Sequence, residues 1–364
     1  MSMRRETDKL GRVAGVGELV RKSYYATTAT TRAVALDASR GCPATLLRGT
    51  GCIAAVRHHA CRFLMLVATL GLLASTGAAD SASLLRQKYP TFVAQAQARG
   101  NHFPFYIESA RDGDNLRADV YVELDYPVSL LAEVLTVPRM WCEFMPLNLN
   151  IKACTWRIKN GKSELRVYAG RKFYQTPAES YLLEYQFQVI KQQKDNFMVV
   201  LTASEGPFGS SDYVILVEAI SVDNGSFLRV HVSYDSSFRS RLLTSAYLAT
   251  LGAGKVGFSV IERTAQGEPI YIKGRRSVTE RNAMRYYLAM LAFLETLALP
   301  SEQRFDARTK RWFDLTELYH KQLHELDKVD YLEAKHRERQ NQLALQAAID
   351  SQRESSIGDN HYSE

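Results

Sequence analysis

Six strand-like runs, separated by short turns, occupy the middle of this chain. They cover residues 151–158, 164–169, 180–189, 197–203, 213–221 and 227–235. Turn signals such as Asn160-Gly161 and Asp223-Asn224-Gly225 lie between them. Parallel neighbours need a crossover of about a dozen residues or more, and these connections are shorter. The spacing therefore predicts one antiparallel, meandering sheet.

Helical patterns and two further strands flank this meander. We predict a leading helix over 83–98, strands over 103–108 and 117–124, short helices over 128–135 and 141–145, a helix over 239–251 and a glycine-rich turn over 252–257. Pro138 separates the two short helices because proline breaks a helix interior. Helices and an antiparallel sheet in this order predict an α+β fold.

A late helix is apolar over much of its circumference. Ser277-Val278-Thr279-Glu280 has the form of a capping box, which predicts a helix from there to about Leu299. Its apolar positions are Ala283, Met284, Tyr286, Tyr287, Leu288, Met290, Leu291, Phe293, Leu294 and Leu297. Such a helix must be largely covered by other elements. Beyond Pro300, we predict amphipathic helices over 300–335 and then a fraying helix and disordered polar tail over 336–364.

The net charge of +7 is confined to the start of the chain. Residues 1–79 contain eleven Lys/Arg and four Asp/Glu, and residues 80–364 contain thirty-five of each sign. A broad basic face is the electrostatic signature of nucleic-acid binding. The neutral main part of the chain therefore argues against a nucleic-acid partner.

Residues 57–79 have the layout of a secretory signal peptide. A basic entry at 57–62 precedes an apolar run at 63–74 and a small-residue exit at 75–79. A helix over the apolar run would be about 18 Å long, against a hydrocarbon core of about 30 Å. The alternatives are an uncleaved membrane anchor over 63–79 and a buried core helix.

Residues 1–56 are rich in Arg, Thr, Ala and Gly and have no sustained apolar periodicity. We expect an unstructured extension. Translation from near Val56 or Met65 would place the signal at the start of the chain, and an organellar transit sequence is the alternative. The expected location is periplasmic or secreted after signal cleavage, or membrane-anchored if the signal is retained.

Two of the five cysteines lie in the main part of the chain. Cys42, Cys52 and Cys61 would leave with the signal, whereas Cys142 and Cys154 remain and can pair. A bridge closing a loop of about 13 residues contributes about 3 kcal/mol in the chain-entropy model. Two buried thiols are the alternative, and without nearby histidines the pair predicts no metal site.

Element order over residues 103–297 resembles the helix-grip fold, and several local motifs are more specific. These are Trp141-Cys142-Glu143, residues 148–154, Gly206-Pro207-Phe208-Gly209 with Asp212-Tyr213, residues 246–250 with 255–258, and residues 280–287. Together they resemble an uncharacterised family of exported bacterial START-like proteins of the helix-grip, SRPBCC type. The resemblance implies a START-like domain over 83–299, with a curved antiparallel sheet closed by the late helix. It also implies a hydrophobic cavity between them, suited to a lipid or sterol-like ligand, and supplies no catalytic residue or cofactor.

Aromatic and basic side chains are the candidate ligand contacts. Trp141, Phe144, Tyr213, Tyr286 and Tyr287 are candidate cavity walls, with ordinary core packing as the alternative. Lys255, Arg276, Arg281 and Arg285 are candidate polar contacts at the mouth. Arg281 and Arg285 share one helix face and could meet a carboxylate or phosphate. A solvated face, or pairing with Glu280, is the alternative.

Sharper catalytic motifs fail on their spacing. Gly252-Ala253-Gly254-Lys255 lacks the first glycine and the hydroxyl residue of a phosphate-binding loop. His320 and His324 match no zinc-protease pattern, so we expect a solvated helix face there.

The sequence favours an exported carrier or sensor of a hydrophobic small molecule or lipid, with no cofactor. The alternatives are a START-like enzyme of the cyclase or hydrolase type, and an envelope assembly protein whose late helices contact a protein partner.

Overall fold

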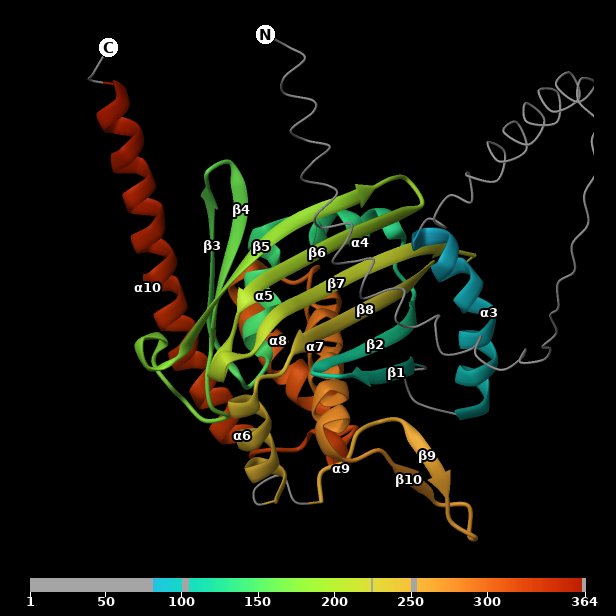
Figure 1. The fold of residues 1–364 in the computed structure, drawn as a ribbon. Helices are drawn as coiled ribbons and strands as arrows, with labels where there is room; N and C mark the ends of the chain where they lie inside the picture. The colour runs from blue at the N-terminus through green and yellow to red at the C-terminus, as the bar shows by residue number, and fades with distance from the viewer. Residues whose placement is uncertain (1–80, 100–104, 224, 250–253, 362–364) are drawn as a thin grey trace, which may run out of the picture. The chain divides into compact units, whose positions relative to one another are not determined.

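The computed structural model describes residues 81–99, 105–223, 225–249 and 254–361 (Figure 1). The predicted targeting segment at 57–79 and the extension before it lie outside the described residues. Among the residues that are described, no helix is long and apolar enough to cross a membrane.

Eight strands form one antiparallel sheet in the order β1-β2-β8-β7-β6-β5-β4-β3. The strands are β1 (Phe105–Asp112), β2 (Asn115–Leu124), β3 (Ile151–Lys159), β4 (Lys162–Ala169), β5 (Tyr181–Gln192), β6 (Asn196–Glu205), β7 (Ser211–Val222) and β8 (Gly225–Asp235). The meander from β3 to β8 is confirmed, and β8 then pairs with β2 in register Val120↔Val230. β1 and β3 are the two edges of an open sheet.

The late helix α7 (Gly274–Glu295) lies against one face of this sheet. Alternate residues of the strands point toward it, among them Val120, Val217 and Val230, and they pack with Met284 and Leu288 in one core. Because successive strand residues face opposite sides, a single register gives the sheet one apolar face for this helix. The expected α+β architecture with a covered late helix is confirmed.

The predicted start of α7 was wrong. The helix begins at Gly274 with Lys273 as its N-cap, and Ser277 lies within the first turn, where its hydroxyl donates to the Gly274 carbonyl at 2.7 Å. The buried carboxylate of Glu280 instead accepts hydrogen bonds from the backbone N–H groups of Phe258 and Ser259, at 2.7 and 2.9 Å. A long-range contact has therefore taken the carboxylate that the capping box would use.

Two short helices, next to β2 in the chain, pack into the core. α4 (Val128–Leu135) and α5 (Pro138–Phe144) confirm the predicted pair, with Pro138 at the first turn of the second helix. A disulfide joins Cys142 of α5 to Cys154 of β3, with the two Cα atoms 4.9 Å apart, which confirms the predicted bridge. α6 (Phe238–Ala249) agrees with the predicted helix over 239–251 as far as it is described.

A small hairpin follows α6 and was not predicted. Its strands β9 (Val260–Arg263) and β10 (Pro269–Tyr271) form a separate two-stranded sheet that projects from the domain in Figure 1. Ile261 is 61% exposed there. Strands this short and this exposed do not produce the apolar alternation on which a sequence-based assignment depends.

The outer face of the sheet carries the leading helix. α3 (Ser81–Arg99) agrees with the helix predicted over 83–98. Its Leu85 and Phe92 are buried with Tyr121 of β2 and Phe227 of β8, and the Phe92 and Phe227 rings lie 4.9 Å apart. This second cluster is distinct from the core beneath α7.

The chain ends in α8 (Ser301–Glu317), α9 (His320–Leu323) and α10 (Lys328–His361). We expected a fraying helix and then a disordered tail over 336–364. The helix α10 continues to His361, and it buries Glu338 and Gln342 of this stretch together with Lys335 just before it. The Gln342 amide accepts from Cys154 N at 2.9 Å and donates to the Cys142 carbonyl at 3.0 Å. Polar side chains thus satisfy the edge strand β3, which would otherwise expose unpaired backbone groups. Helices α8 to α10 and the sheet belong to one compact unit, Ala82–Glu364.

Candidate ligand-binding site

Two adjoining cavities lie between the sheet and the first half of α7. The apolar cavity has a volume of about 540 Å³ and the cationic cavity about 400 Å³. The residues lining both are Asn150, Pro207, Phe208, Tyr213, Val278 and Asn282. Shared walls make the two cavities neighbouring parts of one site.

The two cavities meet along α7, where Val278 and Asn282 line both of them. Val278, Asn282 and Tyr286 recur every four residues and line the apolar cavity. Arg281 and Arg285 follow the adjacent stripe and line the cationic cavity. Residues four apart lie on one helix face, so two neighbouring stripes of one helix present apolar and basic chemistry side by side.

Inward-facing strand residues form the opposite wall of the apolar cavity. They are Val167 of β4, Leu183 and Tyr185 of β5, Ile215 of β7 and Val232 of β8. Burial raises the pKa of Tyr185 and Tyr286 well above the ordinary value, and raises that of Tyr213 to about 12 although a hydrogen bond to Ser210 opposes the shift. These hydroxyls therefore remain protonated at neutral pH.

A buried carboxylate and three cations lie in the wall of the cationic cavity. Oε1 of Glu325 is 2.8 Å from Nη2 of Arg285 and 3.7 Å from Nη1 of Arg281, and its Oε2 is 2.5 Å from Nζ of Lys172. The Glu325 side chain is 6% exposed. Burial alone would raise the pKa of Glu325, but Arg285 and Lys172 outweigh burial and lower it. Glu325 therefore remains ionised at neutral pH.

The arginine pair is not fully satisfied by this carboxylate. Nη1 of Arg281 and Nε of Arg285 are buried and have no hydrogen-bond partner among the described residues. Burial lowers the pKa of Arg285, and Glu325 opposes that shift. Three cations against one carboxylate leave the cluster positive, and the two guanidinium groups keep N–H donors that make no hydrogen bond among the described residues.

Four of the predicted site residues line these cavities. Tyr213 lines both, Tyr286 lines the apolar cavity, and Arg281 and Arg285 line the cationic cavity. The alternative pairing of the arginines with Glu280 is not what the structure shows, because their partner is Glu325.

The other five predicted residues lie elsewhere and line neither cavity. The Trp141 indole donates to the Leu135 carbonyl at 2.7 Å, and Phe144 packs against Phe293. Tyr287 is 2% exposed within the main core. Core packing, the alternative considered for the aromatic residues, describes all three of these side chains.

The two remaining basic residues bind backbone carbonyls. Lys255 donates to the carbonyl of His324, and Arg276 donates from Nη2 to the carbonyl of Ser109 at 2.5 Å. Lys172 and Glu325 were not among the predicted site residues, and they form an ion pair although 153 residues of chain separate them. Each lies in a charged or turn-rich stretch with no local motif, so nothing in the sequence marks either one.

No family model and no curated protein matches the chain. Several solved structures are similar at low identity. Zhui aromatase/cyclase from Streptomyces sp. R1128 is 8% identical over 57% of this chain and 94% of its own, with a TM-score of 0.29. CalU16 from Micromonospora echinospora is 11% identical, and the match covers 60% of this chain and 99% of CalU16, with a TM-score of 0.26. Protein CV1439 from Chromobacterium violaceum is 9% identical, and the match covers 39% of this chain and 94% of CV1439, also with a TM-score of 0.26. TM-scores this low identify neither a fold nor a function.

Proposed function

We propose that this chain is a START-like, helix-grip protein that binds one amphipathic ligand as a carrier or sensor. Its apolar body would occupy the apolar cavity, and its acidic head group would contact Arg281 and Arg285. The observation that carries the proposal is the contiguity of the two cavities, which share Tyr213 and Asn282 but differ in chemistry. An amphipathic molecule is the ligand class that matches both at once.

The apolar cavity suits a lipid-like or sterol-like body. Its volume of about 540 Å³ lies within the range of small-molecule sites, roughly 300–1,000 Å³. Each methylene that leaves water there is worth about 0.8 kcal/mol before the entropic cost of binding. Affinity would therefore come mainly from the apolar body of the ligand.

The cationic cavity favours a carboxylate or phosphate head group. Guanidinium groups bind planar or tetrahedral anions through paired N–H donors, and such charge-assisted bonds are stronger than neutral ones. Nη1 of Arg281 and Nε of Arg285 are buried and make no hydrogen bond among the described residues, and a shift of these side chains would present their N–H groups to the head group. When no ligand is bound, the Glu325 carboxylate balances part of the positive charge of Arg281 and Arg285. This lowers the cost of burying the two guanidinium groups.

The tyrosines of the apolar cavity, which Arg171 and Glu179 also line, favour ligand binding over acid–base catalysis by a tyrosine. A catalytic acid or base works best with a pKa near the operating pH. Tyr185, Tyr213 and Tyr286 have pKa values shifted away from neutrality by burial. Their hydroxyls can orient a ligand as hydrogen-bond donors.

We also propose that the protein acts after export. The motivation is the signal-like layout of residues 57–79 together with the disulfide between Cys142 and Cys154, since disulfides persist in oxidising compartments. N-terminal sequencing of protein isolated from its own host distinguishes the possibilities. A start near Ala79 or Asp80 supports export, and an intact terminus on cytoplasmic protein contradicts it.

Native mass spectrometry of protein purified from its host tests the binding proposal. A co-purifying amphipathic molecule, released on denaturation, is the expected result. Co-purification of apolar ligands without an acidic head group would support the role of the apolar cavity and contradict the role of Arg281 and Arg285 in head-group binding. Protein that is free of any ligand, and that takes up no fatty acid from mixed micelles, would overturn the proposal.

A further inference from the structure

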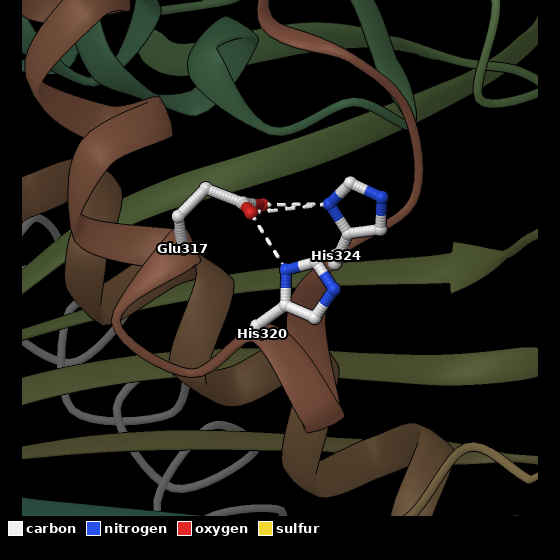
Figure 2. Close-up of side chains that lie close together, drawn as sticks. All are labelled: Glu317, His320 and His324. Carbon is white, nitrogen blue, oxygen red and sulfur yellow. Dashed lines mark hydrogen bonds and ion pairs between the residues drawn. The ribbon is translucent and has the colours of Figure 1, made fainter.

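A second group of side chains converges outside both cavities (Figure 2). Glu317 is the last residue of α8, His320 the first of α9, and His324 the residue that follows α9. Nδ1 of His320 lies 2.8 Å from Oε2 of Glu317, and Nδ1 of His324 lies 3.0 and 3.1 Å from its two oxygens. One carboxylate thus meets two imidazole nitrogens.

A break in the helix produces this arrangement. On one continuous helix His320 and His324 would be neighbours on a solvated face, as the sequence led us to expect. Instead α9 ends at Leu323, and the His324 backbone is extended, with ψ at 131°. The two rings therefore stack with centroids 4.1 Å apart, and both Nδ1 atoms point toward the same carboxylate in Figure 2.

The spacing of the donors suits a small divalent ion. The three possible ligand atoms lie within 4.8 Å of one another. Tetrahedral zinc with bonds of about 2.0–2.1 Å to nitrogen and oxygen places its ligands about 3.3 Å apart. The carboxylate-to-imidazole distances are slightly shorter than this, so a small opening of the cluster would admit the ion. The donor distances are thus close to those of a metal site, and rotation of the exposed His320 ring out of its stack with His324 would direct both Nδ1 lone pairs at one ion (Figure 2).

We propose that Glu317, His320 and His324 bind one divalent transition-metal ion of the zinc and copper class. Imidazole and carboxylate ligands suit these ions. Both histidines would coordinate through Nδ1, with the proton on Nε2, and Glu317 would supply the third ligand. The His320 side chain is 66% exposed, which leaves room for water to complete a four-coordinate site.

This site is independent of the proposed ligand-binding site. None of the three residues lines the apolar or the cationic cavity. Failure of the metal proposal would therefore leave the binding function untouched. An ion here would join the end of α8 to the chain just after α9, which predicts a higher melting temperature with metal bound.

Titration calorimetry with ZnSO₄ and CuSO₄ on the full chain tests the proposal. The parent, His324→Ala and Glu317→Gln share every histidine outside the cluster, so differences among these three arise from the cluster itself. His324→Ala and Glu317→Gln should each lower the affinity of the tightest zinc site by at least about tenfold. Even residues that only hydrogen-bond to a metal ligand lower metal affinity by about tenfold or more when they are replaced, and these two would be ligands themselves. His336→Ala is the matched control, since His336 is half-exposed and lies outside the cluster, with Nε2 at 3.6 Å from Oδ1 of Asp306 and its ring against Phe305.

Electron paramagnetic resonance of the copper-loaded protein gives a second measurement. Hyperfine splitting from two imidazole nitrogens is expected in the parent and from one in His324→Ala. The proposal is wrong if the parent binds neither ion, or if His324→Ala and Glu317→Gln bind zinc as tightly as His336→Ala. Glu317→Gln preserves side-chain shape and so keeps the test valid if the histidine variant is less well folded.

Discussion

Nη2 of Arg285 donates a 2.8 Å hydrogen bond to Oε1 of Glu325, forty residues further along the chain. The pair lies in the wall of the cationic cavity, where an acidic head group would contact the same guanidinium. Both side chains are less than a tenth exposed. Removing the positive charge of Arg285 should therefore weaken the binding of an acidic ligand, and removing the negative charge of Glu325 should strengthen it.

Removing either cavity arginine should weaken binding of an acidic amphiphile. Oleate and oleyl alcohol share a hydrocarbon chain and differ in charge, so their affinities isolate the head-group contribution. Arg281→Ala or Arg285→Ala should reduce the preference for oleate by about 1.5–3 kcal/mol, the range for hydrogen bonds to charged groups. Fluorescence competition measures both ligands. Arg276→Ala is the control, because Arg276 lines neither cavity, and equal preferences in all variants would contradict the head-group role.

Glu325→Gln should have the opposite effect on oleate. The substitution removes the carboxylate that competes with a bound anion, so affinity for oleate should rise while affinity for oleyl alcohol stays the same. Folding stability should fall by up to about 3 kcal/mol, since Arg285 would lose its buried counter-ion. Urea unfolding measures the stability change separately from binding. A fall in oleate affinity in well-folded Glu325→Gln would show that the carboxylate assists the ligand.

Filling the apolar cavity should block the ligand without unfolding the domain. Ile215 and Val217 both point inward from β7 and belong to the buried core, but Ile215 also lines the apolar cavity and Val217 does not. Ile215→Phe should occupy cavity space and abolish binding of oleate at little cost in stability. Val217→Phe should instead overpack the core and cost about 1–3 kcal/mol. Unfolding midpoints and oleate binding check both, and equal destabilisation of the two variants would contradict the cavity assignment.

Reducing the disulfide should destabilise the protein. The bridge closes a short loop, with Cys142 and Cys154 twelve positions apart, and its removal should cost about 3 kcal/mol in the chain-entropy model. Urea unfolding with and without dithiothreitol measures this difference. The double variant Cys142→Ala and Cys154→Ala should show no effect of reductant. An unchanged midpoint for the reduced parent would rule out a stabilising role.

Stability should rise with pH above about 8 because of Lys335 on α10. Burial lowers the pKa of Lys335 to about 8, although Glu338 opposes that shift, whereas lysine in an unfolded chain titrates near about 10.4. Between these values the unfolded state binds more protons, so the free energy of unfolding increases with pH across that window. Below about 8 both states are protonated and this dependence ends.

The comparison of two variants isolates that pH dependence. Lys335→Met should lose the increase in the free energy of unfolding between pH 8 and about 10.4, whereas Lys328→Met should keep it, because Lys328 is exposed on the same helix. Chemical unfolding at a series of pH values measures both. Parallel curves for the two variants would show that Lys335 titrates normally.

Local pattern predicted the elements that depend on backbone periodicity. Strand residues alternate between two faces, so the runs from 151 to 235 indicated strands, and their short turns required antiparallel pairing. The apolar surface of α7 and the Cys142–Cys154 bridge were also predictable from the sequence. The hairpin of β9 and β10 was missed because its short, exposed strands lack that alternation.

Sequence composition was misleading at the polar end of the chain. Lys335, Glu338 and Gln342 suggested a solvated tail, yet they are buried against β3. Their amide and charged groups satisfy backbone and side-chain partners there, such as the 2.8 Å ion pair between Lys152 and Glu338. Polar side chains can be buried when they have hydrogen-bond or ion-pair partners, and the partners of these residues lie nearly two hundred residues earlier in the chain. No local pattern in the sequence could therefore predict their burial.

The sequence by itself determined the strands of the eight-stranded sheet and the covered late helix, and it left Cys142 and Cys154 as the two cysteines able to pair, because each depends on periodicity or composition within a short window. Only the tertiary structure decided which residues of α7 line a cavity and which pack in the core. Tyr286 and Tyr287 are adjacent and both belong to the core, but Tyr286 also lines the apolar cavity whereas Tyr287 does not. The meeting of Arg285 with Glu325 likewise depended on the packing of α7 against the chain that follows α9. A long-range pair of charges has no periodicity, so its geometry arises only when the elements that carry it are packed together.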